Sequence, residues 1–235
     1  INNDIDIKPY SSRYKIYIVP DSEKMTVQAQ NALLKTIEEP PEYAIIILLT
    51  TNADMFLQTI LSRCVLLNIR PVKEETIRNQ LMSEYGIGNY EANVAAVFAN
   101  GNPGKAIKLA TSEDFKELKQ QVVGTLLSLE KGGMDIITQR VKEAGSFKNQ
   151  IDDYFGLMQT WFRDVLLYKA TGDTEKLIFQ DDYHEIVEMS EKISYFHINI
   201  ILKSIDQAWN RIKSNVNFDI TMEVLFLSIK ERIKK

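Results

Sequence analysis

Two short runs near the start of the chain, residues 16–19 and 44–49, are apolar at every position. Such runs are typical of parallel strands that are covered on both faces, where no side chain meets water. A third apolar run at residues 65–67 predicts one more short strand. We therefore expect a buried parallel sheet within residues 1–71.

The segment between the first two strands has the period of an amphipathic helix. Thr26 is a suitable N-cap, and Pro40 and Pro41 end the helix because proline lacks an N–H and clashes with the preceding turn. Apolar side chains recur on one predicted face, at Ala29, Ala32, Leu33 and Ile37. A strand, a helix and a strand of these lengths predict a right-handed βαβ crossover.

Beyond Pro71 the pattern is helical. Residues 72–112 predict a small domain of three short helices, the last with Asn102 as N-cap and Pro103 at its first position. Residues 113–235 predict a bundle of longer helices, the last capped by Asn217. The central helix of this bundle is predicted to bury one face, formed by Tyr154, Met158, Trp161 and Val165.

Composition excludes several classes of function. The 235 residues carry a formal charge of −4, which gives no electrostatic basis for strong nucleic-acid binding by this chain alone. Cys64 is the single cysteine and His184 and His197 are the two histidines, so an internal disulfide and a multi-Cys/His zinc site are both excluded. This cysteine usage fits a reducing cytoplasm. No apolar run is long enough to span a membrane, and no signal peptide is recognisable.

The point where the first strand ends raises a question about nucleotide chemistry. Many nucleotide-binding folds place a pair of acids there, to hold a metal ion and a water molecule. Here Pro20 and Asp21 occupy these two positions, and proline has no side-chain oxygen. The sequence also lacks a GxxxxGK[ST] phosphate-binding loop. Asp21 is therefore either an acid at a helix entry or the relic of a catalytic pair.

Two motifs carry a family resemblance. The run AQNALLKTIEEPP at residues 29–41 is followed by TILSRC at residues 59–64, and together they resemble bacterial clamp-loader subunits of the AAA+ class. The segments WFRDVLLYKATGD and NVNFDITMEVLFL resemble the collar domain of the delta-prime branch of this family. The resemblance implies an α/β part followed by an all-α part. We expect the family's P-loop segment, with any zinc module, to precede residue 1.

The resemblance assigns roles to residues around a nucleotide site. Pro20 and Asp21 match the two acids of the Walker B pair. Thr50, Thr51 and Asn52 end the second strand where the family has its polar sensor; without a P-loop or a metal-binding acid, they equally fit a role in capping the strand end. Gly104, in GNPGKA, stands where active relatives carry an arginine that reaches the γ-phosphate. Lys105 beside it would point about 100° around the helix and is a poor substitute. These losses imply a site that does not hydrolyse ATP, with no cofactor and no metal.

The SRC motif, formed by Ser62, Arg63 and Cys64, has the opposite implication. In this family its arginine reaches across a subunit boundary to the ATP of a neighbour, and a planar, permanently charged guanidinium suits phosphate oxygens. The simpler interpretation of Arg63 is a surface arginine in a salt bridge. Ser62 and Cys64 are expected to set its backbone and packing. No histidine lies near Cys64 in sequence, which argues against a nucleophilic cysteine.

These observations predict three parts: a degenerate, partial AAA+ domain at residues 1–71, a helical lid at 72–112 and a helical collar at 113–235. The resemblance implies a non-hydrolysing stator subunit of the DNA polymerase III holoenzyme that supplies Arg63 in trans. Its partners would be gamma/tau and delta subunits in a pentameric ring, with the sliding clamp and primed DNA contacted through the assembly. The alternative is an active ATPase subunit of the gamma/tau type. A helical scaffold outside replication is a third possibility, which the SRC motif argues against.

Overall fold

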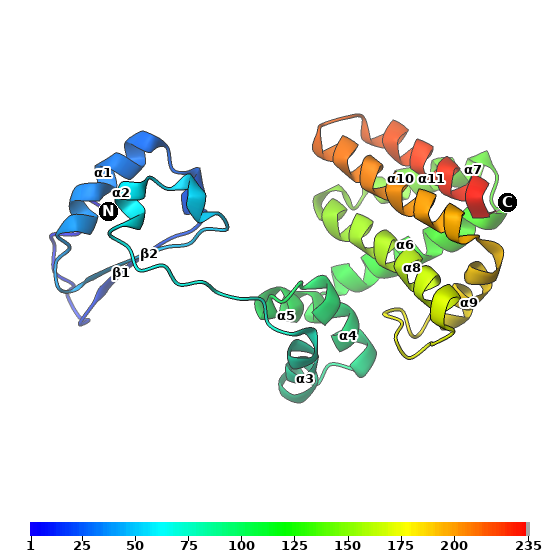
Figure 1. The fold of residues 1–235 in the computed structure, drawn as a ribbon, viewed down its shortest axis with the longest axis horizontal. Helices are drawn as coiled ribbons and strands as arrows, with labels where there is room; N and C mark the ends of the chain where they lie inside the picture. The colour runs from blue at the N-terminus through cyan, green and yellow to red at the C-terminus, as the bar shows by residue number, and fades with distance from the viewer. Residues whose placement is uncertain (234–235) are drawn as a thin grey trace. The chain divides into compact units, whose positions relative to one another are not determined.

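The computed structural model describes residues 1–233 and divides the chain into two compact units, Ile1–Ile69 and Arg70–Lys235 (Figure 1). The N-terminal unit contains the strands, and the C-terminal unit is helical. Over the described residues, no helix combines the length and apolarity needed to cross a membrane.

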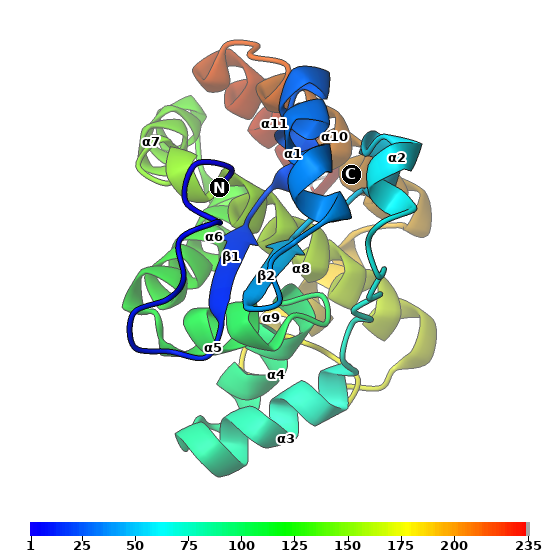
Figure 2. The same ribbon diagram turned by 90° about the vertical axis from the view of Figure 1, so that its left-hand side faces the viewer.

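Two parallel strands form the sheet of the N-terminal unit. β1 (Lys15–Val19) pairs with β2 (Ala44–Leu48) in a register that sets Lys15 opposite Ala44, and α1 (Val27–Glu38) connects them. Figure 2 shows the two strands side by side. The predicted parallel strand pair is confirmed. Short turns of helix follow each strand: η1 (Ser22–Lys24) after β1, then η2 (Ala53–Met55) and α2 (Gln58–Leu61) after β2.

Two predictions about this sheet are wrong. The strands are not covered on both faces, because burial alternates along them and four isoleucine side chains stay 39–61% exposed: Ile16, Ile18, Ile45 and Ile47. Residues 65–67 are not a strand either; Val65 is 87% exposed and Leu67 is 77% exposed. A strand needs a partner for its backbone hydrogen bonds, and among the described residues this segment has none.

Helix α1 begins as predicted, but its buried face is turned from the predicted one. The Thr26 hydroxyl accepts a hydrogen bond from the Ala29 N–H at 3.3 Å, which confirms the N-cap. Ala29 and Ala32 are exposed, whereas Leu33 and the polar Gln30 are buried. The apolar pattern alone could not predict this face, because burial of the polar Gln30 side chain depends on hydrogen-bond partners that come together only in the folded chain.

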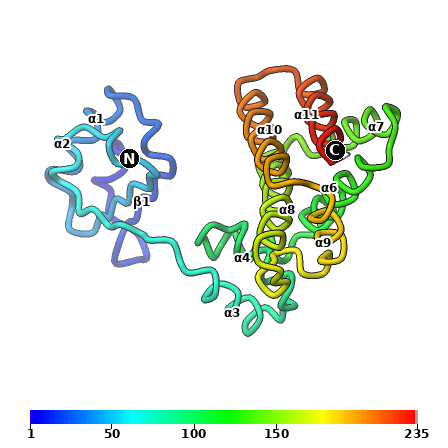
Figure 3. Tube along the Cα trace, turned by 45° about the vertical axis from the view of Figure 1, so that its right-hand side comes forward, coloured from blue at the N-terminus to red at the C-terminus, as the bar shows by residue number. Residues whose placement is uncertain are grey.

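The C-terminal unit is built from helices joined by loops, of which the α8–α9 connection at residues 172–182 is long (Figure 3). Three short helices come first: α3 (Glu74–Tyr85), α4 (Asn89–Phe98) and α5 (Pro103–Thr111). The remaining elements are α6 (Glu113–Lys131), α7 (Met134–Gly145), η3 (Lys148–Gln150), α8 (Ile151–Thr171), α9 (Tyr183–Lys192), α10 (Tyr195–Lys213) and α11 (Phe218–Ile233).

One hydrophobic core runs through the whole C-terminal unit, from Ile77 on α3 to Ile233 on α11. The central helix is α8, and its predicted buried face is confirmed, with Tyr154, Met158, Trp161 and Val165 all at 0% exposure. Caps are confirmed as well: the Asn102 side chain accepts from the Lys105 N–H, and that of Asn217 accepts from the Ile220 N–H, both at 3.0 Å. The short helices and the bundle therefore fold as one body.

Candidate functional site

The end of β1 leads into a strained turn. Asp21 has φ 48° and ψ 40°, the left-handed region that non-glycine residues rarely adopt. Its carboxylate lies 3.0 Å from the Lys24 ammonium, one turn along η1. Pro20 before it supplies no side-chain oxygen. The two positions after β1 therefore hold one proline and one carboxylate that is ion-paired with Lys24.

Polar groups at this edge of the sheet bind one another. The Ser22 N–H donates to the Leu49 carbonyl at 2.8 Å and its hydroxyl donates to the Val19 carbonyl at 2.6 Å, which joins the ends of both strands. The Thr51 hydroxyl donates to the Glu23 carboxylate at 3.1 Å. The structure thus brings Thr51 to the edge where Pro20 and Asp21 lie.

Glu23 is a residue of this edge that sequence reasoning missed. A hydrogen bond from its own backbone N–H is the main cause that lowers the pKa of its carboxyl, and the bond from the Thr51 hydroxyl acts in the same direction. Its second carboxylate oxygen is buried without a hydrogen-bond partner among the described residues. Since Glu23 lies in a one-turn helix after the strand, no spacing in the sequence marked it.

The residues around Thr51 also make local turn contacts. The Thr50 hydroxyl accepts from the Asn52 N–H and donates to the Asn52 carbonyl, both at 3.0 Å, and the Asn52 side chain accepts from the Asp54 N–H. These bonds end β2 and start η2. Within residues 1–233, no group of three or more His, Cys, Asp or Glu side chains is arranged to hold a metal ion.

The SRC motif follows α2, and its arginine is held by groups of its own unit. Arg63 Nη2 lies 2.5 Å from a carboxylate oxygen of Glu38, at the end of α1. Nη1 donates to the Thr59 carbonyl at 3.0 Å and to the Ser62 hydroxyl at 3.3 Å. Cys64 is exposed at the surface. The protein atoms packed around its thiol still displace some water, and this desolvation raises the thiol pKa, which disfavours the nucleophilic thiolate.

Gln30 anchors the segment that carries Arg63. Its amide N–H groups donate to the carbonyls of Met25 (3.3 Å) and Met55 (3.2 Å), and its carbonyl accepts from the Leu57 N–H at 2.8 Å. Because Leu57 is the N-cap residue of α2, these bonds fix the start of α2 against α1. A polar residue beside the apolar face of α1 was the one sequence signal for this role.

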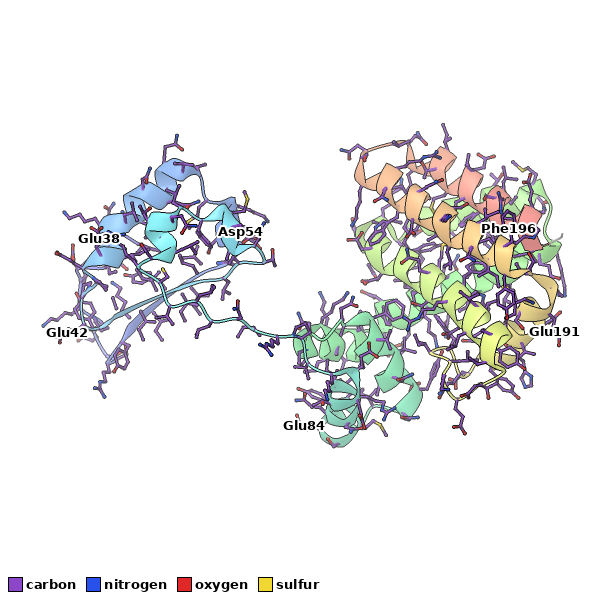
Figure 4. All side chains as sticks on the ribbon, viewed as in Figure 1. Glu38, Glu42, Asp54, Glu84, Glu191 and Phe196 are labelled. Carbon is purple, nitrogen blue, oxygen red and sulfur yellow. The ribbon has the colours of Figure 1, made fainter. Side chains whose placement is uncertain are left out.

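Arg63 and the strand-end residues lie at different ends of the N-terminal unit. Pro20, Asp21 and Thr51 follow the carboxyl ends of β1 and β2. Glu38, the ion-pair partner of Arg63, ends α1 shortly before β2 begins, so it belongs to the amino ends of the strands. Figure 4 labels Glu38 and Asp54 on opposite sides of this unit. The structure therefore does not bring Arg63 to its own strand-end site.

Gly104 lies in the first turn of α5, in the C-terminal unit. Its neighbour Lys105 places its ammonium 3.3 Å from the Asp153 carboxylate of α8. This ion pair engages Lys105 in a contact between α5 and α8.

Comparisons with known proteins match both units. The family described as "DNA polymerase III, delta subunit" matches residues 1–73, and "DNA polymerase III, delta subunit, C terminal" matches residues 113–231. The chain is 30% identical over 224 residues to the delta' subunit of DNA polymerase III from Bacillus subtilis, covering 94% of this chain and 67% of that protein.

Two less similar proteins are also described as, or as related to, subunits of DNA polymerase III. The tau subunit of DNA polymerase III from Bacillus subtilis is 28% identical over 234 residues, covering 87% of this chain and 41% of that protein. A crystal structure of a gamma subunit-related protein from Thermotoga maritima aligns with a TM-score of 0.48 at 20% identity, over 99% of this chain and 77% of that one. The assignment rests on the two family matches and the delta' relative: the chain belongs to the delta-type clamp-loader subunits of bacterial DNA polymerase III.

Proposed function

We propose that this chain is a non-hydrolysing stator of the clamp loader that supplies Arg63 to ATP bound by a neighbouring subunit. The observation that carries the proposal is the position of Arg63, which pairs with Glu38 at the end of the unit away from the strand-end residues. A guanidinium there cannot serve a nucleotide at its own strand ends, but it is 37% exposed and open to a partner. Arginine fingers accelerate phosphoryl transfer by about 10³- to 10⁵-fold.

Two features support the absence of hydrolysis at the chain's own site. Pro20 cannot bind magnesium, and the Asp21 carboxylate is occupied by Lys24. Gly104 has no side chain to reach a phosphate, and Lys105 is occupied by Asp153. The alternative, an ATP-hydrolysing subunit of the gamma/tau type, would have to replace both missing groups.

The proposed assembly follows from the family. Residues 1–71 would be the C-terminal part of a degenerate AAA+ domain, residues 72–112 the lid and residues 113–235 the collar. Gamma/tau and delta subunits would complete a pentameric ring that opens the sliding clamp and places it on primed DNA. The shared core of lid and collar helices supports a rigid, stator-like part. The net charge of −4 fits DNA contact through the assembly and not through this chain alone.

The test uses the subunit reconstituted with its ATPase partner subunits. We expect Arg63→Ala to assemble normally and to remove one site's contribution to clamp- and DNA-stimulated ATP turnover. Arg13→Ala is a matched control, because Arg13 is an exposed arginine of the same unit that stacks on its neighbour Tyr14. Equal turnover for wild type and Arg63→Ala would refute the finger and leave Arg63 as a surface ion pair.

A further inference from the structure

The acid that holds Arg63 lies where helix energetics disfavour it. Glu38 is the last residue of α1 and Glu39 is its C-cap. The C-terminus of a helix carries a partial negative charge, so acids there are destabilising and bases are favoured. Local rules are most often broken at functional positions. Lys35 is a base in the same last turn, and the Arg63 guanidinium is the group that forms an ion pair with Glu38.

The contacts of Arg63 conflict with its proposed task. Three acceptors of its own unit bind the guanidinium: the Glu38 carboxylate, the Thr59 carbonyl and the Ser62 hydroxyl. Two of these are neutral, and one carries a full negative charge. A phosphate that approached the same guanidinium would meet the Glu38 carboxylate as a like charge. A phosphate and Glu38 are therefore competitors for Arg63.

We propose that Glu38 restrains Arg63 in the separate subunit, and that the γ-phosphate of the neighbour's ATP must displace Glu38 before Arg63 can act. This inference rests on the proposed finger role of Arg63. Thr59 and Ser62 lie on the same turn as Arg63 and can keep its stem in place once the carboxylate is displaced. Arg63 would stay paired with Glu38 until a phosphate is present. Its guanidinium would then pass from the Glu38 carboxylate to the γ-phosphate, so that it is paired with an anion in both states.

The size of the effect follows from the exposure of the pair. The side chains of Arg63 and Glu38 are 37% and 46% exposed, and ion pairs of this kind are weak and screened by salt. Removing the charge of Glu38 should therefore raise kcat/KM for ATP by roughly two- to fivefold at low ionic strength. The gain should shrink toward unity as salt rises. A purely structural role of Glu38 would not give this salt dependence.

The experiment compares Glu38→Gln with Glu39→Gln in the reconstituted full-length loader, with equal melting temperatures as the folding criterion. Glu39 is adjacent and exposed, so its substitution removes the same charge without touching the Arg63 contact. We expect Glu38→Gln to raise kcat/KM with the stated salt dependence and Glu39→Gln to leave it unchanged. In an Arg63→Ala background, Glu38→Gln should have no effect.

Each other outcome is decisive. If Glu38→Gln matches wild type while Arg63→Ala still lowers turnover, the restraint is wrong and the finger role stands. If Glu38→Gln lowers kcat/KM, Glu38 positions Arg63 for catalysis and the restraint is again wrong. If Arg63→Ala itself has no effect, the proposed function fails and the restraint fails with it.

Discussion

A buried carboxylate holds the loop between α8 and α9, and its replacement gives a sharp stability prediction. Asp164 is 1% exposed and accepts hydrogen bonds from the N–H groups of Ile178 and Phe179 at 2.7 and 2.8 Å. Phe179 in turn packs edge-on against Trp161, with ring centroids 5.5 Å apart. The carboxylate thus fixes a loop whose apolar side chains complete the core.

Two variants separate the hydrogen bonds from the charge. Asp164→Ala leaves two buried N–H groups without acceptors, at about 1–3 kcal/mol each, so we expect a loss of about 2–6 kcal/mol. Asp164→Asn keeps an oxygen that can accept both bonds and carries no charge. We therefore expect it to retain most of the stability at pH 7.

Wild type and Asp164→Asn should also differ in how their stability depends on pH. Burial is the main cause that raises the pKa of Asp164 to about 6, against an ordinary value of 3.8. Because the folded state holds the proton more tightly, this group's contribution to stability falls as pH rises between these values. The full difference corresponds to about 3 kcal/mol, of which about 2 kcal/mol lies between pH 4.5 and 7. Between about pH 4.5 and 7, the free energy of unfolding of wild type should therefore fall by this amount relative to that of Asp164→Asn.

Urea unfolding followed by tryptophan fluorescence measures this, since both tryptophans, Trp161 and Trp209, lie in the C-terminal unit. Asp114→Asn, at an exposed aspartate of α6, is the control. The reasoning is refuted if Asp164→Ala costs less than about 1 kcal/mol. It is equally refuted if the difference between wild type and Asp164→Asn is the same at both pH values.

Three further predictions follow from single contacts. Gln30→Ala should cost about 1–3 kcal/mol, because it leaves the partly buried Leu57 N–H without its acceptor. Hydrogen exchange of the Leu57 amide should become faster, and unchanged exchange would contradict the anchoring role of Gln30. Trp161→Ala should cost about 3–5 kcal/mol in urea unfolding, since the side chain is fully buried at the centre of the bundle, and a loss under 1 kcal/mol would exclude that position. Lys105→Met should cost less than about 1 kcal/mol and leave ATP turnover of the reconstituted loader unchanged, because the pair with Asp153 is partly exposed; lower turnover would revive Lys105 as a phosphate contact.

Apolar periodicity predicted the C-terminal unit well and the sheet only in part. The face of α8 around Trp161 is buried as expected because neighbouring helices cover it within the same chain. The strands were assigned correctly, but Ile16 and Ile45 stay exposed. An apolar run indicates that its residues are suited to burial. It does not indicate whether other elements pack over them. The prediction of a strand at residues 65–67 was wrong for a related reason, because a β-strand forms only where a neighbouring strand accepts and donates its backbone hydrogen bonds.

Sequence reasoning proposed the candidate site residues but did not predict the contacts that hold them. Pro20, Asp21 and Thr51 do meet at one edge of the sheet, because parallel strands end on the same side. The pairing of Arg63 with Glu38 and the anchoring by Gln30 were not predictable, since they join residues about 25 positions apart through side-chain contacts. Periodicity carries no information about which polar groups will find each other.

The most direct measurement of the central claim is a single-turnover assay of ATP hydrolysis by the reconstituted loader bound to clamp and primed DNA. We predict that Arg63→Ala slows ATP hydrolysis at one site by about 10³-fold or more, with the other sites and the assembly unchanged. The same rates and amplitudes of hydrolysis for wild type and Arg63→Ala would contradict a finger supplied in trans.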